Sequence, residues 1–365
     1  MTNPIRVLCV LGALDIGGAE NRTMDIYRGI DRSRIQFDFM VHTQKIGHYE
    51  SEIHMLGGRV YRTVPRFKVY NYIKYRKEWK KFLTDNFYST IHIMTYNTAL
   101  PILQAAIQAG VKTRIVHSRN SKSMGIWRSL VMRISRPFIR RLATHRLAVS
   151  DPAGRHVFGK CYDVKPNGVD VNVFRFDSVR RAKMRQQWGV EESFVLGAVA
   201  RLVPVKNHSF MFHVFAQVVK AIPDAVLFLV GDGDYMQALK KQVANMKLDD
   251  RIFFVGARKD VPDLLQCFDV FLMPSKYEGF PGAALEAQAA GLPALLSDTI
   301  TSEVNVVKNL VTYLPINMGT QPWIQVIIDV FNSQNTRSNN IEDIINAGYG
   351  VQSVIKWYEE LYTSD

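Results

Sequence analysis

Residues 273–293 read MPSKYEGFPGAALEAQAAGLP and join a strand end to a loop and a helix. The apolar residues 270–273 before them predict a buried strand. Pro281 suits the first position of a helix, because its missing N–H has no intrahelical partner there. Gly291 and Pro293 then mark the helix end. The segment therefore predicts strand, loop and helix in succession, with unpaired backbone N–H groups at the helix start.

Such a helix start favours an anion, because the free N–H groups and the helix dipole both present positive charge. Two carboxylates flank it, Glu278 in the loop and Glu286 in the second helical turn. A diphosphate between two acids fits a nucleotide-sugar, whose ribose and transferred sugar offer hydroxyl groups on either side. On spacing alone, a structural role for Glu286 is equally well supported, since the dipole favours acids there.

The motif around these acids resembles the signature of family 4 glycosyltransferases, retaining enzymes of the GT-B fold. It consists of Glu-Gly-Phe-Pro at 278–281 and Leu-Glu-Ala at 285–287, with seven residues between the two acids. Residues 285–293 and 297–301 resemble the capsular and exopolysaccharide branch of that family. The resemblance implies that Glu278 holds the donor sugar and Glu286 the ribose. It further implies that the donor contacts the segment formed by Gly279, Phe280, Pro281 and Gly282.

Composition indicates a protein of two domains, because 365 residues exceed one ordinary core and 47% of them are hydrophobic. No apolar run reaches the roughly 18 residues of a bilayer span, and the N-terminus does not have the pattern of a signal peptide. The three cysteines, Cys9, Cys161 and Cys267, are widely spaced. This predicts a reducing, cytoplasmic location without disulfides or a zinc site.

Charge is unevenly distributed along the chain. Residues 1–170 contain 28 lysines and arginines against 12 acids, whereas the remainder contains 18 against 21. This asymmetry predicts an acidic partner for the first half, which is an anionic membrane surface, nucleic acid or a phosphorylated substrate.

Two segments in this half, 70–86 and 125–142, predict amphipathic helices that mix aromatic side chains with bases. Such helices suit an anionic bilayer surface. Packing of either helix on a sheet, with its charges solvated, is equally well supported for each alone. The membrane hypothesis for the second helix rests on Trp127, Arg133, Arg136, Arg140 and Arg141, and Trp79 is the corresponding aromatic of the first.

Strands and helices alternate along the whole chain, which predicts two Rossmann-like, doubly wound parallel sheets. The expected boundaries are 1–168 together with the last helix, 348–365, for an acceptor-binding and membrane-facing domain, and 169–347 for a donor-binding domain. In the first domain, Gly17 and Gly18 follow the first strand, and the resemblance places such glycines beside the donor between the domains. His117 ends a later strand. A histidine there is more often a hydrogen-bonded loop residue than a catalyst, but the resemblance favours a catalytic role near the transferred sugar.

In the second domain, Arg201 and Lys206 follow a predicted strand and resemble the family's phosphate-binding pair. Arg258 follows another strand end, where the family's loop contacts the nucleobase. Asp232 and Asp234 follow a predicted strand but have the pattern of turn residues, so we expect neither a metal site nor a cofactor besides the nucleotide-sugar substrate.

The sequence thus predicts a metal-independent, retaining glycosyltransferase at the inner face of the plasma membrane. The expected substrates are a nucleotide-sugar, with UDP as the expected nucleotide, and a lipid-linked capsular or exopolysaccharide acceptor. One alternative is a non-hydrolysing sugar-nucleotide epimerase of similar fold. A nucleic-acid-binding protein is disfavoured, because no stacking motif or recognition helix is evident.

Overall fold

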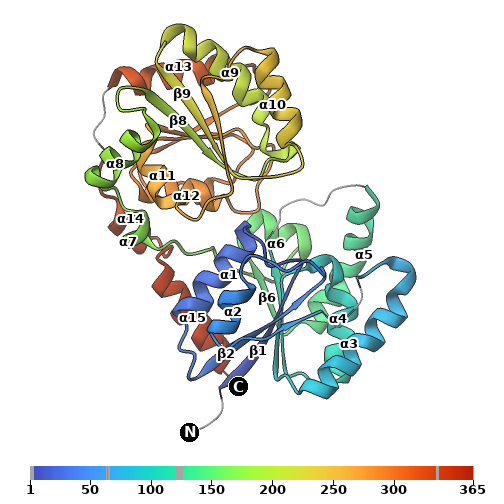
Figure 1. Cartoon of the computed structure of the whole chain (residues 1–365). Helices are drawn as coiled ribbons and strands as arrows, with labels where there is room; N and C mark the ends of the chain where they lie inside the picture. The colour runs from blue at the N-terminus through green and yellow to red at the C-terminus, as the bar shows by residue number, and fades with distance from the viewer. Residues whose placement is uncertain (1–3, 63, 65, 120–125, 334–336, 365) are drawn as a thin grey trace. The chain divides into compact units, whose positions relative to one another are not determined.

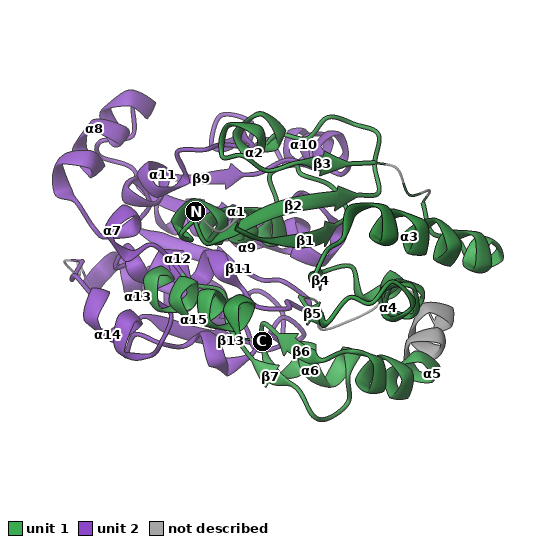
Figure 2. Cartoon of the chain, turned by 90° about the horizontal axis from the view of Figure 1, so that it is seen from below, with its two compact units in different colours: residues 1–168, 351–365 green, residues 169–350 purple. Residues whose placement is uncertain are grey.

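The computed structural model describes residues 4–62, 64, 66–119, 126–333 and 337–364, except for the side chains of residues 126–132. The chain divides into two compact units, Met1–Gly168 with Val351–Asp365, and Val169–Gly350. Each unit contains a parallel sheet with its own core (Figures 1 and 2). The predicted α/β class with two doubly wound parallel sheets is confirmed.

The sheet of unit 1 has the strand order β3-β2-β1-β4-β5-β6-β7, and all its pairs are parallel. Its strands are β1 (Ile5–Leu11), β2 (Ile35–Val41), β3 (Val60–Tyr61), β4 (Thr90–Ile93), β5 (Thr113–Ser118), β6 (His145–Ala148) and β7 (Asp163–Val164). The central strands are buried almost throughout, as expected for a parallel sheet covered by helices on both faces. Strands β2 and β3 are added on one side of β1, and strands β4 to β7 on its other side. The point between β1 and β4 is therefore the topological switch.

Two helical layers cover this sheet. The helices are α1 (Gly18–Gly29), α2 (Glu50–Met55), α3 (Tyr72–Asn86), α4 (Ala99–Gln108), α5 (Ile126–Leu142), α6 (Asp151–Val157) and α15 (Val351–Thr363). Alternate residues of β1 serve the two layers: Leu8 and Val10 join the core with α3, α4 and α5, whereas Val7 and Cys9 join the core with α1, α2 and α15. The C-terminal helix α15 therefore completes the core of unit 1 (Figure 2).

The sheet of unit 2 has the order β10-β9-β8-β11-β12-β13, with its switch between β8 and β11. Its strands are β8 (Phe194–Val199), β9 (Ala225–Val230), β10 (Ile252–Gly256), β11 (Val270–Met273), β12 (Ala294–Ser297) and β13 (Val311–Leu314). Its helices are α7 (Val171–Phe174), α8 (Ser178–Trp188), α9 (His208–Ala221), α10 (Met236–Asn245), α11 (Val261–Cys267), α12 (Gly282–Ala289), α13 (Gln321–Ser333) and α14 (Ile341–Asn346). Helices α9, α10 and α13 cover one face of the sheet, and α11 and α12 the other (Figure 1).

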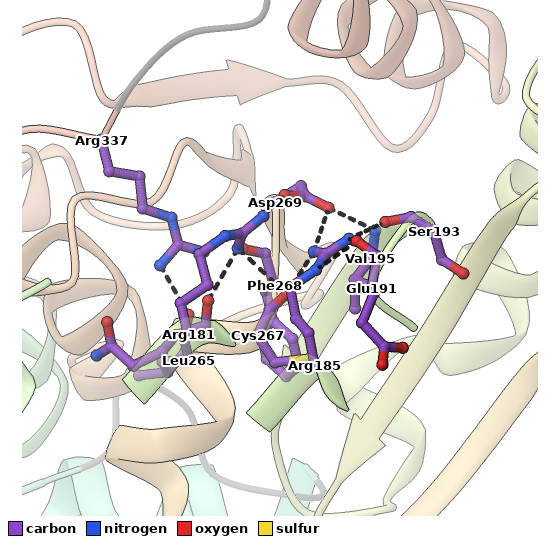
Figure 3. A network of polar contacts seen from close by, with 11 residues as sticks. Arg181, Arg185, Glu191, Ser193, Val195, Leu265, Cys267, Phe268, Asp269 and Arg337 are labelled. Atoms are coloured by element: carbon purple, nitrogen blue, oxygen red, sulfur yellow. Dashed lines mark hydrogen bonds and ion pairs between the residues drawn. The ribbon is translucent and has the colours of Figure 1, made fainter. Parts of the chain in front are cut away.

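A polar network at the amino ends of β8 and β11 fixes α8 to the sheet (Figure 3). Asp269 accepts a hydrogen bond from the backbone N–H of Val195 at 2.7 Å and pairs with Arg181 at 2.5 Å and Arg185 at 3.1 Å. Arg185 is only 8% exposed and also donates to backbone carbonyls, including that of Cys267 at 3.0 Å. The network holds together the two strands whose opposite ends carry the predicted donor site.

Several local expectations differ from the structure. Trp79 and Tyr75 are fully buried between α3 and the sheet, so Trp79 cannot serve as the membrane contact that its sequence position suggested. Its indole ring instead packs near the rings of Tyr75 and Phe82. Strand β13 and helices α13 and α14 lie in stretches to which the sequence pattern assigned no element.

Candidate active site

The switch point of unit 2 gathers three of the predicted site residues. Arg201 and Lys206 lie in the loop after β8, and Glu278 lies in the loop after the neighbouring strand β11. The Lys276 N–H donates to the Val205 carbonyl at 2.8 Å, which joins the two loops. Ligands of doubly wound sheets bind beyond the carboxyl ends of strands at such a point. The geometry therefore brings two cations and a carboxylate to the expected place for a ligand.

Lys206 and Glu278 form a close ion pair, with 2.6 Å between Nζ and Oε1. Their side chains are only 17% and 11% exposed, so the pair is largely shielded from water. Arg201 differs, because its side chain is exposed and its guanidinium makes no hydrogen bond to another residue that the structure describes. A ligand phosphate thus meets one uncommitted cation, Arg201, and one cation that must leave a carboxylate, Lys206.

Two glycines hold the loop after β8 in place beside the end of β9. A Cβ atom on Gly231 would clash with the Ala200 carbonyl oxygen, and one on Gly233 with the Leu202 carbonyl oxygen. The Leu202 N–H donates to Asp232 O at 2.9 Å across the same contact. This close backbone packing requires glycine at both positions and gives Arg201 a rigid base.

Glu286 is 8% exposed in the second turn of α12. The expectation for the start of this helix is wrong by one residue: Pro281 is the N-cap and Gly282 the first helical residue, because Pro281 has ψ 75°. Some of the N–H groups expected to be unpaired are engaged, since Gly282 donates to Phe280 O at 3.0 Å and Ala284 to Pro281 O at 2.9 Å. The anion site at this helix start is correspondingly weaker than the sequence suggested.

The predicted donor contacts at Phe280 and Arg258 already have partners within unit 2. The ring of Phe280 stacks on Tyr349 with centroids 5.6 Å apart and is 9% exposed, so this segment can offer a ligand its backbone rather than that ring. Arg258 makes two hydrogen bonds to Asp260, at 2.7 and 2.5 Å. This hydrogen-bonded carboxylate raises the pKa of Arg258, so the guanidinium stays charged, but its charge is already balanced by Asp260. Arg258 therefore does not add a free cation.

In unit 1, Gly17 and Gly18 lie at the start of α1. Gly17 is the N-cap with extended backbone, and its N–H donates to Asn21 Oδ1 at 3.1 Å. In the described part of the chain, no atom outside the helix backbone and the two neighbouring residues lies within 4 Å of where a Cβ of Gly18 would be, so a ligand can approach this backbone closely. Arg119, which the sequence pattern did not single out, lies beside this loop, with Nη1 3.4 Å from Ala19 O.

His117 is at the carboxyl end of β5 but lies under α15, with only 1% of its surface exposed. Its Nδ1 is 3.2 Å from Nε2 of His92 and 3.4 Å from the hydroxyl of Tyr358. Burial lowers the pKa of His117 well below its usual range, and the nearby positive charge of Arg119 lowers it further. The ring is therefore neutral at physiological pH.

The predicted membrane residues on α5 are in different environments. Arg133 and Arg141 are exposed. Arg136 instead donates to the His156 carbonyl, with Nε at 3.0 Å, and Arg140 to the Phe158 carbonyl at 2.8 Å, so these two guanidinium groups stabilise the end of α6. The Trp127 side chain lies outside the described residues.

Among the residues that the structure describes, no group of three or more His, Cys, Asp or Glu side chains has an arrangement that fits a metal ion. In the described part of the chain, no helix has the length and hydropathy required to cross a bilayer.

The chain is similar to proteins of a known family over most of its length. Residues 180–346 match the family model "Glycosyl transferases group 1". The glycosyltransferase EpsF of Bacillus subtilis is 32% identical over 359 residues, which cover 95% of this chain and 93% of EpsF. The capsular polysaccharide biosynthesis glycosyltransferase CapH of Staphylococcus aureus is 26% identical and covered over 78% of each chain.

Two other similar proteins have a named ligand. A UDP-Gal:α-D-GlcNAc-diphosphoundecaprenol α-1,3-galactosyltransferase of Escherichia coli is 32% identical over 207 residues, or 54% of this chain and 53% of the relative. The crystal structure of Anabaena HepE in complex with UDP and glucose aligns with a TM-score of 0.82 at 22% identity, covering 99% of this chain and 100% of HepE. This likeness shows the GT-B fold.

Proposed function

The chain belongs to the group 1 glycosyltransferases, and on that premise we propose that it transfers a sugar from a UDP-sugar to a lipid-linked saccharide during polysaccharide synthesis. The transfer retains the configuration at the anomeric carbon. The observation that carries this proposal is the grouping of Arg201, Lys206 and Glu278 beyond the switch point of unit 2. This grouping offers a diphosphate two cations and a sugar one carboxylate.

When the donor binds, Lys206 exchanges its partner Glu278 for a phosphate group of the donor. The exposed guanidinium of Arg201 attracts the diphosphate first, and Lys206 then leaves Glu278 for a phosphate oxygen. Glu278, released from Lys206, accepts hydrogen bonds from hydroxyl groups of the sugar. Glu286, in the second turn of α12, accepts hydrogen bonds from the ribose hydroxyls.

Departure of UDP breaks the bond between the anomeric carbon and the β-phosphate oxygen, and negative charge develops on that oxygen. Arg201 and Lys206 stabilise this charge, and preorganised donors of this kind are each worth roughly 10²–10³ in rate. The acceptor hydroxyl attacks from the face that UDP leaves, and its proton passes to the departing phosphate. The two cations thereby fill the role that a divalent metal has in other transferases, so we infer metal-independent catalysis.

Two similar proteins support the proposal of UDP and of a lipid-linked acceptor, and the excess of bases in residues 1–170 agrees with an acceptor held at a membrane. HepE binds UDP and glucose, and the E. coli relative uses UDP-Gal and a diphosphoundecaprenol-linked acceptor.

We further propose that unit 1 contacts an anionic membrane surface. Exposed apolar side chains stand beside bases around the start of α3, with Tyr70 in the turn before the helix 82% exposed and Ile73 in its first turn 63% exposed next to Lys74.

The test is incubation with UDP-glucose, UDP-galactose and UDP-N-acetylglucosamine, each with and without a bacterial lipid extract, followed by mass spectrometry. We expect a lipid product one sugar heavier with one of the UDP-sugars, and its absence with Glu278→Gln. Conversion of one UDP-sugar to its epimer without any acceptor would instead establish the epimerase alternative. Absence of both products with every UDP-sugar would contradict the proposed donor.

A further inference from the structure

A chain of buried polar side chains connects the C-terminal helix to His117 within unit 1. The hydroxyl of Tyr362 lies 2.7 Å from Nδ1 of His92, and Nε2 of His92 lies 3.2 Å from Nδ1 of His117. Tyr358, one turn earlier on α15, places its hydroxyl 3.4 Å from the same His117 nitrogen. All four side chains are at most 3% exposed, so water does not compete for these bonds.

Both imidazoles are neutral in this environment. Burial lowers the pKa of His92 to about 3 and that of His117 well below its usual range. Each ring therefore carries one N–H and one lone pair. Among the described residues, Arg119 is the charged group that acts on both rings, and Cys9, Tyr358 and Tyr362 are the titratable groups beside them.

Only two proton arrangements give a hydrogen bond between the rings. In the first, Tyr362 donates its O–H to His92 Nδ1, His92 donates from Nε2 to His117 Nδ1, and His117 carries its proton on Nε2. In the second, every donation is reversed and His117 carries its proton on Nδ1. The distances alone do not distinguish these two arrangements, because heavy-atom positions are shared by both.

The tyrosines decide between them. Among the residues that the structure describes, neither phenol has another hydrogen-bond partner. The second arrangement would bury both phenol O–H groups without an acceptor, which is unfavourable. The first arrangement uses the O–H of Tyr362 fully, whereas the O–H of Tyr358, at 3.4 Å, shares the single lone pair of His117 Nδ1 with the His92 N–H. It leaves one unpaired donor, the N–H on His117 Nε2, and this nitrogen is indeed buried without a partner in the described structure.

We infer that Tyr362 and His92 are positioning residues that hold His117 as the Nε2–H tautomer. His117 then meets a ligand at Nε2 as a hydrogen-bond donor and not as a general base, because that nitrogen has no lone pair to accept a proton. The oxygen that it serves belongs to the substrate of the proposed transfer, so this part of the inference rests on the proposed function. The tautomer itself is a property of the free protein and does not depend on any substrate.

The experiment is ¹⁵N NMR of the full chain labelled at its nine histidines. His117→Gln and His92→Gln identify the two resonances. In the wild type, the ¹⁵N chemical shifts of the two His117 ring nitrogens should be those of the Nε2–H tautomer alone. In Tyr362→Phe the ratio of the Nε2–H to the Nδ1–H tautomer should fall roughly 10-fold, equivalent to about 1.4 kcal/mol, because the only strong donor to His92 Nδ1 is gone.

Tyr75→Phe is the matched control. Tyr75 is itself buried, its hydroxyl lies 2.7 Å from Nε2 of the half-buried His42, and the loss of this hydroxyl should leave His117 unchanged. A wild-type His117 protonated on Nδ1 overturns the inference. This measurement is made on the wild-type protein and so does not depend on whether a variant folds. An unchanged tautomer ratio in Tyr362→Phe overturns it as well.

A kinetic measurement separates this inference from the proposed function. Tyr362→Phe should lower kcat for UDP release several-fold while the affinity for UDP stays constant, and Tyr75→Phe should change neither. A shifted tautomer with unchanged kcat would overturn the assignment of the Nε2–H to the substrate. Failure of the wild type with every UDP-sugar would count against the proposed function alone, since the NMR result is independent of it.

Discussion

Replacing Glu278 by glutamine should raise the affinity for UDP while it lowers turnover. In the free protein, Glu278 holds Lys206 at 2.6 Å in a largely buried pair. A hydrogen bond between charged groups contributes roughly 1.5–3 kcal/mol, and UDP must break this bond before Lys206 can reach a phosphate. Glutamine has nearly the same shape but carries no charge, so Lys206 becomes free for the nucleotide.

The magnitude follows from the same bond. Removal of a competing interaction of 1.5–3 kcal/mol strengthens UDP binding by roughly 10-fold or more, since each 1.4 kcal/mol is tenfold. Lys206→Met removes the bond to the phosphate as well as the competing bond to Glu278, so UDP should bind it roughly 10- to 100-fold more weakly than it binds Glu278→Gln. A gain in affinity from Glu278→Gln without a gain from Lys206→Met is the distinctive outcome.

Isothermal titration calorimetry with UDP measures both affinities, and UDP release from the donor measures turnover. Asp263→Asn is the matched control, because it neutralises the acid of another ion pair in unit 2, 2.6 Å from Arg180, and should leave UDP affinity unchanged. If Glu278→Gln weakens UDP binding, Glu278 contacts the nucleotide directly and the partner exchange is wrong.

Four further outcomes are expected. Glu286→Ala should weaken UDP binding by roughly 10-fold or more in calorimetry, because a charged hydrogen bond to ribose is lost; unchanged affinity would assign Glu286 to the structural role. Turnover should survive EDTA, and rescue of a chelated enzyme by Mg²⁺ or Mn²⁺ would disprove charge stabilisation by Arg201 and Lys206 alone. Cosedimentation should show binding to anionic but not neutral vesicles, reduced by salt and by Ile73→Ser, and equal binding to both lipids would refute the electrostatic contact. Burial lowers the pKa of His208 to about 4, so the unfolded chain binds a proton between pH 6.5 and 4 that the folded chain does not. Urea unfolding should therefore show stability falling by up to about 1.4 kcal/mol per pH unit from this group as pH drops through that range, and His208→Gln should flatten the slope.

The sequence predicted those features that depend on neighbouring residues. The strand, loop and helix around Glu278 follow from local signals, and so do the strand ends that carry Arg201 and His117. Helix α13 was missed although its buried side chains, Trp323, Ile324 and Ile327, recur at helical spacing.

Contacts between distant residues could not be predicted. Lys206 and Glu278 are separated by 72 positions, and only the parallel pairing of β8 with β11 brings them together. His117 and Tyr358 are 241 positions apart, so the burial of the histidine depends on where the last helix packs. Trp79 shows a related difficulty, because an aromatic residue among lysines fits both a membrane face and a core face.

The place of α15 in the core of unit 1 determines the order in which the protein becomes folded on the ribosome. Unit 2 is one continuous segment, Val169–Gly350, and can fold as soon as it has emerged. Unit 1 is synthesised first but lacks Val354, Tyr358 and Tyr362 until synthesis has passed residue 362. At about 5–20 residues per second, its sheet waits roughly 10–40 s with the part of this face that α15 covers still exposed. We therefore expect unit 2 to complete its fold before unit 1, which reverses the usual N-terminal-first order and leaves the surface around Cys9 and Phe37 exposed during this interval.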